Sequence, residues 1–435
     1  MRITFLTHYY PPEGNAPASR VHAMCRRWVE AGHEVTVLTC APNVPDGVVY
    51  TGYRNRWYSR EVCDGVQVIR GWIYIAANRG LVRRIASFLS YFVMAVWRSL
   101  RLPKPDVVVA TTPQFFCGWA GVWAARWWRC KFVLEVRDLW PESIVAVTDP
   151  ERWRGGLRGA VLRYLEWLER RMYQAADHIV TVGDGYRQRL LDKGVDTRRL
   201  TVVTNGVESQ LFVPRAPDRT LRAQAGAADD QFLVGYVGTV GMAHGLEVVL
   251  DAARLARDRG QRKLRFLVVG DGAQRATLEA DLARDDPGNV RFVGRRPKSE
   301  MPRWLASVDA CLVHLRPTQL FQTVLPSKMF EALAMERPVI LGVDGYAAKL
   351  LRALQGGVVV RPGSAEELVT AAAAWAEDLD HARSVGRRGR QAVLRGYDLD
   401  HLAGRYEQLL LQVSEGRSPA GYDERSVEPR RRAAA

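Results

Sequence analysis

The chain has 435 residues, 47% of them hydrophobic and 25% charged, which is typical of ordinary globular domains. This length suits two or three domains with separate cores. The first residues read as a strand and not as a secretory leader, so we expect a cytoplasmic protein. The six cysteines contain no C-x-x-C pair, which argues against a disulfide framework or a cysteine metal site.

The net charge of +15 favours an anionic partner, such as a phosphate-bearing substrate, an acidic membrane surface or nucleic acid. Most of the 62 basic residues are arginines. An arginine-rich composition without functional meaning explains the total charge equally well. The total therefore decides nothing by itself, and the places where the charges cluster carry the argument.

The first half of the chain alternates apolar runs with amphipathic stretches. Continuous runs of Val, Ile and Leu are typical of strands covered on both faces of a parallel sheet. We expect helices at Ser19–Ala31, Arg83–Leu100 and Leu157–Ala175. We expect strands at Ile3–Thr7, Glu34–Thr39, Val66–Arg70, Val107–Thr111, Phe132–Val136, Ile179–Val182 and Thr201–Thr204. The alternation predicts an α/β, doubly wound domain over residues 1–205.

A polar segment with two prolines, residues 206–219, reads as a linker to a second α/β domain over residues 220–379. The strands expected there are Phe232–Val237, Leu264–Val269, Val290–Val293, Ala310–Leu315, Pro338–Leu341 and Val358–Val360. Ligands of parallel sheets bind beyond the carboxyl ends of the strands. We therefore expect two Rossmann-like domains whose sheets face a central cleft. The tail, residues 414–435, has few apolar residues and is predicted to be disordered.

Two segments of the first domain combine arginines with aromatic side chains. Gly80–Leu102 is the most apolar, but its uninterrupted apolar core, Ile85–Trp97, is too short for the roughly 20 residues that cross a bilayer. Trp119–Lys131 has the same character. Basic, aromatic, amphipathic helices are typical of segments that lie in a membrane interface. A core helix with arginines at its exposed ends is the alternative.

Two groups of polar residues follow predicted strands of the first domain. Gly14, Asn15 and Arg20 lie in a loop that opens a helix, where free backbone N–H groups favour anions, so we expect an acceptor or phosphate loop there. A plain structural turn is equally consistent. Arg137 and Asp138 end a buried strand that also carries Glu135, where charges are costly unless they are used. We expect Arg137 and Asp138 to act in catalysis, and an ion pair that fastens the next loop is the alternative.

Glycine-rich loops follow the first two strands of the second domain and predict an anion cradle. The lone His244 fits a helix-capping role as well, and Gly270-Asp271-Gly272 fits a tight turn. The absence of G-x-G-x-x-G argues against an NAD enzyme. The donor-binding residues expected in these loops and after the third strand are Gly238, Thr239, Gly241, His244, Gly270, Arg295 and Arg296.

The densest group of candidate residues is Leu325-Pro326-Ser327-Lys328 with Glu331. Pro326 and Ser327 suit a helix start, so Lys328 lies in the first turn, where the helix dipole disfavours a cation unless an anion is present. Glu331 follows one turn later on the same face. We expect Lys328 to hold a diphosphate and act in catalysis, and Glu331 to accept ribose hydroxyls. A surface salt bridge is the alternative.

These patterns together resemble the retaining glycosyltransferases of family 4, which have the GT-B fold. The motifs are a Pro-Pro-x-x-Gly-Asn loop, Arg-Asp-Leu-Trp-Pro-Glu-Ser at 137–143, Ala-Asp-His-Ile-Val at 176–180, Asn-Gly-Val-Glu at 205–208, Gly-Tyr-Val-Gly at 235–238, Val-Val-Gly-Asp-Gly at 268–272 and Pro-Ser-Lys at 326–328. The resemblance spans residues 1–413. It is greatest to the bacterial subgroup that makes O-antigen and colanic acid and includes fucosaminyltransferases.

The resemblance implies that the second domain binds a nucleotide-diphosphate sugar and the first binds the acceptor. Glu331 takes the place of the second glutamate of the E-x(7)-E signature, which holds the ribose, and Thr323 stands at the first. No cofactor or metal is expected, since the family is metal-independent and no Asp-x-Asp motif is present. Helices over residues 380–413 would cross back to the first domain.

The implied reaction moves a hexose or N-acetylhexosamine-type sugar, with retention, to a polyprenyl-diphosphate-linked or saccharide acceptor. The protein would then act peripherally at the inner face of the plasma membrane. No nucleic-acid-binding module is recognised, so nucleic acid is not an expected partner. A GT-B nucleotide-sugar 2-epimerase and a non-catalytic nucleotide-sugar-binding protein are the alternatives.

Overall fold

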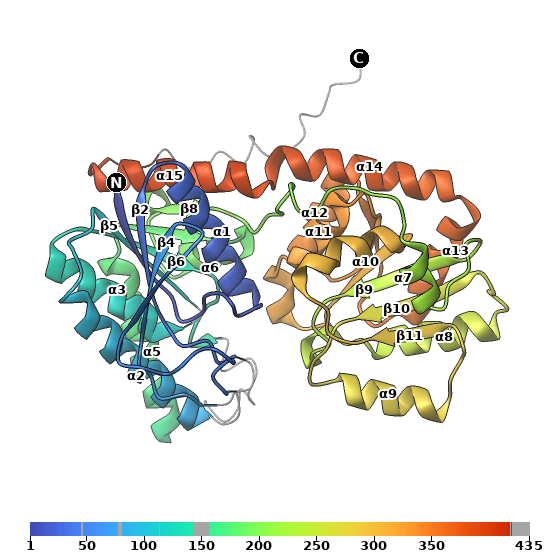
Figure 1. Ribbon diagram of the computed structural model, residues 1–435, viewed down its shortest axis with the longest axis horizontal. Helices are drawn as coiled ribbons and strands as arrows, with labels where there is room; N and C mark the ends of the chain where they lie inside the picture. Colours follow the sequence, from blue (N-terminus) through green and yellow to red (C-terminus); the bar gives the residue numbers. More distant parts are fainter. Residues whose placement is uncertain (45–46, 77–80, 113, 143–155, 418, 420–435) are drawn as a thin grey trace, which may run out of the picture. The chain divides into compact units, whose positions relative to one another are not determined.

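The computed structural model describes residues 1–435 except 45–46, 77–80, 113, 143–155, 418 and 420–435 (Figure 1). The described chain forms two compact units. The first consists of Met1–Asn205 together with the described part of Asp400–Asp423, and the second of Gly206–Leu399. The boundary at Asn205 coincides with the start of the predicted linker. Most of the tail predicted to be disordered lies outside the described residues.

The first unit contains an eight-stranded sheet in the order β3-β4-β2-β1-β5-β6-β7-β8. Every neighbouring pair is parallel except β3 and β4. The strands are β1 (Arg2–Leu6), β2 (Glu34–Cys40), β3 (Ser59–Cys63), β4 (Val66–Gly71), β5 (Val107–Thr111), β6 (Lys131–Val136), β7 (His178–Thr181) and β8 (Leu200–Val202). Seven of these correspond to predicted strands, with ends that differ by at most two residues.

Strand β3 was not predicted. Its burial alternates between half-buried and exposed residues, as in an edge strand with one face in solvent, and it lacks the apolar run that marks the central strands. Asp64 and Gly65, which join it to β4, have φ values of 48° and 78°. Positive φ at both central residues is the geometry of a tight hairpin turn, for which Asp-Gly is a preferred pair.

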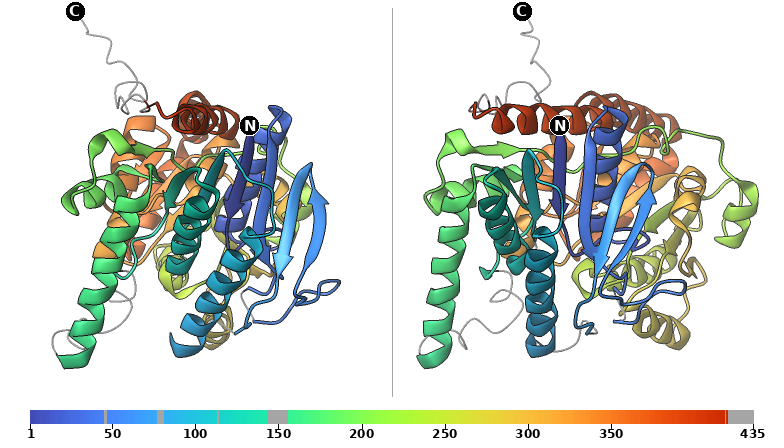
Figure 2. Two further views of the ribbon diagram at one scale, coloured as in Figure 1. Left: turned by 90° about the vertical axis from the view of Figure 1, so that its left-hand side faces the viewer. Right: turned by 60° about the vertical axis from the view of Figure 1, so that its left-hand side comes forward.

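Helices cover both faces of the first sheet. The helices of this unit are α1 (Ala16–Glu30), α2 (Leu81–Ser99), α3 (Phe115–Trp128), α5 (Gly156–Ala175), α6 (Asp184–Asp192) and α15 (Leu399–Ser414), with a short turn η2 (Thr197–Arg199). Figure 2 shows α2, α3 and α5 side by side on one face. On the other face α1 packs against α15, where the ring of Trp28 meets that of Tyr406 at 5.2 Å and its indole N–H donates to the carbonyl of Ala403.

The second unit contains a six-stranded, all-parallel sheet in the order β11-β10-β9-β12-β13-β14. Its strands are β9 (Phe232–Val237), β10 (Leu264–Val269), β11 (Val290–Val293), β12 (Ala310–His314), β13 (Val339–Gly342) and β14 (Gly357–Val359). The prediction of this second α/β domain is therefore confirmed. Both cores of the unit are built from alternate residues of the same strands, as a two-sided sheet requires.

Two layers of helices enclose this sheet. The helices are α7 (Arg219–Gln224), α8 (Glu247–Asp258), α9 (Arg275–Arg284), α10 (Met301–Ser307), α11 (Ser327–Ala334), α12 (Tyr346–Leu354), α13 (Ala365–Glu377) and α14 (Leu379–Gly396). Short turns are η3 (Met242–His244), η4 (Lys298–Glu300) and η5 (Gln319–Thr323). Helices α10, α11, α12 and α14 share one core, and α8 and α13 share the other.

The return of the chain to the first unit begins later than predicted. Helix α14 packs on α11 and α12 of the second unit, and only from Asp400 does the chain belong to the first. Asp400 and Glu407 of α15 then pair with Arg27 and His33 of the first unit, at 2.5 and 2.8 Å. Within the described residues, none of the helices is both long enough and apolar enough to cross a bilayer.

The contact between α1 and α15 gives a first prediction. Trp28 is fully buried, whereas Trp127 on α3 is 63% exposed. Replacing Trp28 with Ala should lower the free energy of unfolding by about 3–5 kcal/mol, because a large cavity remains in a packed core. Trp127→Ala should change it by less than about 0.5 kcal/mol. Urea denaturation followed by circular dichroism measures both free energies of unfolding. Similar losses in the two variants would contradict the role of Trp28 in holding α1 against α15.

Candidate active site

The first turn of α11 carries a lysine that reaches across to the loop after β9. Helix α11 begins at Ser327, so Lys328 lies at the end that disfavours a cation. Its side chain lies against Gly238, where an added Cβ would be 1.9 Å from the lysine Cε and 2.8 Å from its Nζ. Gly238 also has a φ of 147°. Only glycine fits at this position, because any side chain would displace the lysine.

Among the residues that the structure describes, no anion is bonded to the ammonium group of Lys328. Within the described part of the chain it makes no hydrogen bond and no ion pair, and its Nζ lies 5.5 Å from the centre of the Tyr236 ring. Burial lowers the pKa of Lys328, and the carboxylate of Glu331 offsets this only in part. A partly buried cation without a partner is the kind of group that an incoming anion stabilises.

Glu331 lies one turn further along α11 in a mixed-charge environment. Burial raises the pKa of its carboxyl group, the charges of Lys328 and Lys298 lower it, and the charge of Glu208 raises it. Lys298 in turn pairs with Glu208 at 3.2 Å. Lys298 gives no signal in the sequence, because one lysine in a polar loop forms no pattern. Glu208 is visible there only as part of the Asn-Gly-Val-Glu motif.

The loops that follow β9 and β10 contain glycine because their backbones pack closely against each other. A Cβ on Gly270 would lie 1.8 Å from the carbonyl oxygen of Gly238, and one on Gly272 would lie 2.5 Å from that of Val240. Gly270 therefore lets the loops after β9 and β10 touch, which is a structural reason for this residue. Thr239 is exposed at the tip of the first loop, and Gly241 has an ordinary extended backbone.

His244 lies close to the same lysine. Burial lowers its pKa to about 4, with a further contribution from the charge of Lys328, so the ring is neutral at pH 7. Its Nδ1 is buried, and among the described residues nothing bonds to it. The ring meets that of Tyr236 edge to face at 5.9 Å. The predicted residues Gly238, His244, Lys328 and Glu331 are thus brought together at one edge of the second sheet.

The other predicted donor residues lie around this edge. Leu325 is buried, and Pro326 and Ser327 form the start of α11 without a side-chain cap. Arg295 and Arg296 are exposed in the loop after β11. The guanidinium of Arg296 lies 6.0 Å from the centre of the Trp304 ring.

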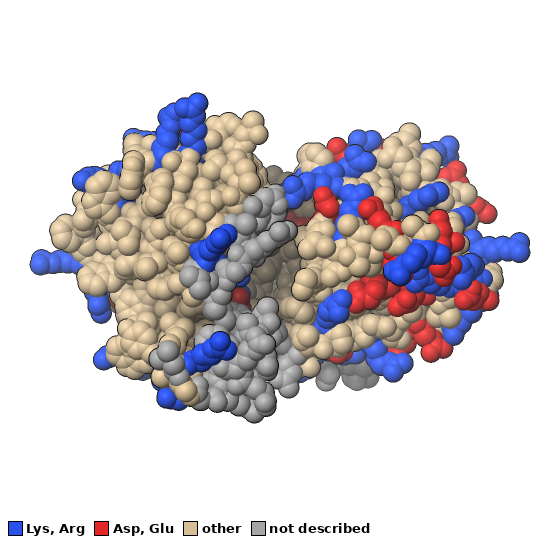
Figure 3. Space-filling model, turned by 90° about the horizontal axis from the view of Figure 1, so that it is seen from below, with Lys and Arg blue, Asp and Glu red and all other residues tan. Residues whose placement is uncertain are grey.

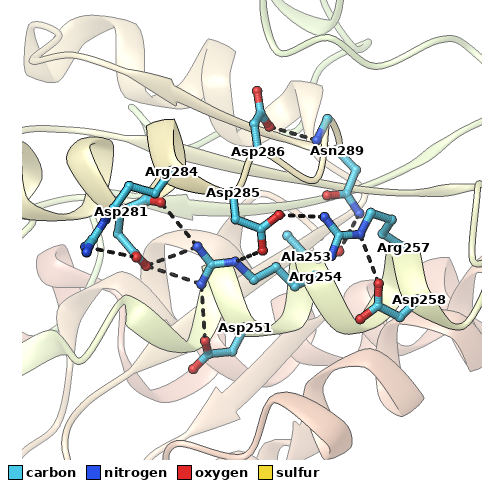
Figure 4. A network of polar contacts seen from close by, with 11 residues as sticks. Asp251, Ala253, Arg254, Arg257, Asp258, Asp281, Arg284, Asp285, Asp286 and Asn289 are labelled. Carbon is cyan, nitrogen blue, oxygen red and sulfur yellow. Dashed lines mark hydrogen bonds and ion pairs between the residues drawn. The ribbon is translucent and has the colours of Figure 1, made fainter.

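Other arginines of this unit are neutralised by carboxylates. Figure 4 shows Arg254 and Arg257 of α8 in a network of aspartates. Arg254 contacts Asp281 at 3.2 Å, and both arginines contact Asp285, at 3.1 and 2.8 Å. Isolated surface ion pairs add little stability, whereas several charges in a network can add more. This network leaves no uncompensated charge for a ligand, in contrast to Lys328.

In the first unit, Arg20 has a structural role that differs from its prediction as an acceptor-loop residue. It is only 5% exposed, and its Nε pairs with Glu135 at 3.3 Å. Its two terminal nitrogens donate to the carbonyls of Thr204 and Val203, both at 2.7 Å. Glu135 also accepts from the hydroxyl of Thr111. Arg20 therefore ties α1 to β6 and to the segment after β8.

Arg137 lies at the end of β6 and differs from Arg20 in its bonding. Its Nε and one terminal nitrogen are buried and bond to none of the described residues. Burial lowers its pKa to about 10, although the charge of Glu135 raises it. The backbone N–H groups of Arg137 and Asp138 both donate to the hydroxyl of Thr112, at 2.9 and 3.3 Å. These bonds fix the backbone at the end of β6, and the two unbonded nitrogens of the guanidinium are available to a ligand.

The first loop is organised by its own polar side chains. Asn15 caps α1 by accepting from the N–H of Ala18 at 2.9 Å, so this residue serves the helix start. Gly14 has open space where a Cβ would lie, so no close approach requires a glycine there. Glu13 accepts from the N–H groups of Asn43 and Val44, at 2.8 and 3.1 Å. These bonds join the loops after β1 and β2.

One group of side chains in the described residues has metal-ligand types within reach of one another. It consists of His22 on α1 with Cys63 and Asp64 at the β3–β4 turn. The Nε2 of His22 lies 2.9 Å from the carboxylate of Asp64, and the Asp-Gly turn accounts for Asp64 at this position. The group belongs to the first unit, whereas Lys328 and Glu331 belong to the second.

Comparison with known proteins settles the class of the enzyme. Residues 15–206 match the family model of the glycosyl transferase 4-like domain, and residues 231–378 match that of glycosyl transferases group 1. The chain is a glycosyltransferase. The enzyme class expected from sequence is therefore confirmed, and one matched region falls within each of the two units apart from a residue at the boundary.

One relative and two solved structures illustrate the similarity. The putative colanic acid biosynthesis glycosyl transferase WcaI of Escherichia coli K12 is 26% identical over 377 residues, which are 85% of this chain and 90% of WcaI. Sucrose-phosphate synthase from Thermosynechococcus elongatus superposes with a TM-score of 0.71 at 18% identity, covering 95% of this chain and 99% of that one. HepE from Anabaena, in complex with UDP-glucose, superposes with a TM-score of 0.65 at 16% identity, covering 95% and 100%. The fold of the glycosyltransferase is GT-B.

The two buried arginines of the first unit give a second prediction. Arg20→Ala leaves Glu135 buried without its partner and should lower the free energy of unfolding by about 3–5 kcal/mol. Arg137→Ala removes a cation whose buried nitrogens lack partners, so stability should be unchanged or slightly higher while transferase activity falls. Denaturant melts compare the two variants. An equal loss of stability would show that Arg137 is as structural as Arg20.

Proposed function

We propose that the enzyme transfers a hexose or N-acetylhexosamine-type sugar from a nucleotide-diphosphate donor to a lipid-linked or saccharide acceptor, with retention of configuration. The pathway we propose is cell-surface polysaccharide synthesis, as the name of WcaI indicates for that relative. The fucosamine-type donor sugar of a fucosaminyltransferase falls within this class. The observation that carries the proposal is the ammonium group of Lys328, seated under Gly238 and without a bonded anion among the described residues.

The donor diphosphate would bind where Lys328 and the loop after β9 meet. A lysine supplies one positive charge, and the backbone N–H groups of a glycine-rich loop supply donors at fixed positions. Such preorganised groups stabilise the charge that develops on the leaving diphosphate. The complex of HepE with UDP-glucose supports a nucleotide-sugar ligand for this fold. Glu331, on the same face of α11, would accept the ribose hydroxyls.

The transfer step breaks the bond between the anomeric carbon and the diphosphate oxygen. The acceptor hydroxyl oxygen forms the new bond on the same face, and its proton passes to the departing diphosphate. The products are the glycoside and the nucleoside diphosphate. Lys328 and the loop amides supply the positive potential, so we propose that neither a metal ion nor another cofactor is needed. Arg137 would bind an anionic group of the acceptor, with Asp138 beside it.

The helices α2, α3 and α5 support peripheral binding to an acidic membrane. One side of α2 is in the core through Phe88 and Tyr91, whereas Trp97 is 44% exposed and Trp123 of α3 is 54% exposed. The guanidinium of Arg101 lies 3.7 Å from the centre of the Trp97 ring. Figure 3 shows, on the view from below, a first unit with scattered Lys and Arg and few Asp or Glu, while the second unit carries both signs.

The helix α2 thus has one core face and one exposed apolar face, and the exposed face supports the proposed interfacial role. Helix α5 adds Tyr164 and Trp167, which are also exposed and stack at 5.9 Å. Aromatic rings with apolar bodies and basic neighbours favour the headgroup region of an anionic bilayer. We propose that this surface holds the enzyme at the inner face of the plasma membrane, where a polyprenyl-diphosphate acceptor would be available.

The proposed function is tested by binding and product analysis. Calorimetry with UDP-, GDP-, ADP- and dTDP-sugars identifies the donor, and mass spectrometry with and without a polyprenyl-diphosphate acceptor identifies the product. Transfer that requires the acceptor and persists in EDTA supports the proposal. Release of an epimerised sugar without acceptor would show an epimerase, and binding without turnover would show a non-catalytic protein.

The charge on Lys328 gives a third prediction. Lys328→Met should lower kcat about 10²–10³-fold, as expected for the loss of a group that stabilises the leaving charge. Glu331→Gln should raise the donor KM with a smaller effect on kcat. Because burial lowers the pKa of Lys328, nucleotide affinity of the wild type should fall as the pH rises through that lowered pKa, where the amine becomes neutral.

The pH profile provides its own control. Lys328→Met should bind nucleotide weakly at every pH, because it carries no charge to lose. Calorimetric titrations between pH 7 and pH 10 compare it with the wild type. Wild-type turnover in Lys328→Met, or an identical alkaline loss of affinity in both proteins, would contradict the assigned role.

The exposed aromatic rings give a fourth prediction. Replacing Trp97, Trp123, Trp127 and Trp167 with Ser should reduce sedimentation with phosphatidylglycerol vesicles by at least about tenfold, since each ring loses apolar contact with the bilayer. The fold should persist, because all four side chains are exposed. A matched control replaces the exposed Tyr58 and Val62 near β3. Unchanged binding of the four-site variant would discard the membrane proposal.

A further inference from the structure

The short turn η3 is held by the segment that follows β12. Three successive carbonyl groups of this turn accept hydrogen bonds from only two residues. Arg316 donates its Nε to Met242 at 2.7 Å and its backbone N–H to Ala243 at 2.9 Å. His314 donates its Nδ1 to the carbonyl of His244 at 2.6 Å. Each carbonyl of the turn therefore points toward the end of β12.

His314 also bonds on its other side. It is 3% exposed, and its Nε2 accepts from the backbone N–H of Gly363 at 2.8 Å. A carbonyl can only accept and an amide N–H can only donate, so the two bonds require one neutral tautomer. Burial lowers the pKa of His314, in agreement with a neutral ring.

The surroundings of this ring are glycines. An added Cβ on Gly342 would lie 2.3 Å from the ring of His314, and one on Gly245 would lie 3.2 Å from it. Gly363, whose N–H donates to the ring, has a φ of 80°. The imidazole is thus enclosed by the end of β13 and by the loops that follow β9 and β14. One side chain bonds to two strand-end loops at the edge of the sheet where Lys328 lies.

The direction of the carbonyls determines the direction of the amides. In a planar trans peptide the N–H points opposite to the C=O of the same unit. The N–H groups of Ala243, His244 and Gly245 therefore point away from the β12 segment. That of His244 is used within the turn, where it donates to the carbonyl of Gly241 at 3.0 Å. The N–H of Gly245 shares its peptide unit with the carbonyl that His314 binds. The ring of His244 and the ammonium of Lys328 both lie close to Tyr236, at 5.9 and 5.5 Å from its ring. The turn thus lies beside the proposed diphosphate position.

We propose that His314 is a positioning residue for the donor, which orients the N–H of Gly245 toward the diphosphate through its bond to the carbonyl of His244. This inference rests on the proposed function of the site. His314 does not touch the donor itself. Its contribution is to fix a loop that would otherwise have to be ordered by the ligand.

Two variants separate the two bonds of the ring. His314→Asn places an amide nitrogen near the position of Nδ1 and keeps a donor for His244. His314→Gln places an oxygen near the position of Nε2 and keeps an acceptor for Gly363. Each variant loses one hydrogen bond, so their losses of thermal stability should be similar. Their effects on the donor KM should differ, because only the bond to the carbonyl of His244 orients η3.

Donor KM, kcat and amide hydrogen exchange in residues 242–245 are measured for both variants and the wild type, with the nucleotide sugar that the wild type uses. We expect His314→Gln to raise the donor KM about tenfold and to speed exchange in the turn. His314→Asn should stay within about threefold of the wild type. Equal KM values in the two variants, or exchange that is unchanged in His314→Gln, would overturn the inference.

Different results would overturn the proposed function and the inference on His314. A wild-type protein that binds no nucleoside diphosphate would overturn the proposed function, and with it the assigned purpose of His314. A wild-type protein that transfers sugar, with variants that differ only in stability, would overturn the inference on His314 and leave the proposed function standing.

Discussion

The side chain of Lys328 can lie across the loop after β9 only because residue 238 has no side chain. An alanine there would place its Cβ 1.9 Å from the lysine Cε. The lysine starts at the wrong end of α11 for a cation and ends without a bonded anion among the described residues. Its burial is therefore unfavourable in the absence of a ligand. A site that stabilises a ligand's charge commonly carries such a cost to its own stability.

The two units use charge in two ways. Where a cation is structural, it is neutralised, as Arg20 is by Glu135 and as Arg254 is by its aspartates. Where buried donors bond to none of the described residues, as in Arg137, the guanidinium has capacity for an anion. This difference separates residues that hold the glycosyltransferase together from residues that can bind its substrates. It also explains why neighbouring arginines of the first unit have different expected effects on stability.

The glycine loops illustrate how one residue type serves different purposes. Gly238 makes room for a lysine, Gly270 makes room for a neighbouring backbone, and Gly342 makes room for the ring of His314. Gly14 has open space around it and none of these reasons. The same letter in the sequence therefore predicts a loop reliably, but the group that passes close to it is decided by elements far away along the chain.

The sequence by itself determined the architecture of each unit, because period and apolar content are local properties. The apolar runs located the central strands within one or two residues, and the order Pro326-Ser327-Lys328 located the start of α11. The edge strand β3 was not predicted, since a half-exposed strand lacks an apolar run. Only the tertiary structure decided which polar side chains bond to other parts of the protein and which remain able to bind a ligand. Arg20 and Arg137 look alike in sequence, but the partners of Arg20 lie 115 to 184 residues away, and only folding brings them within bonding distance.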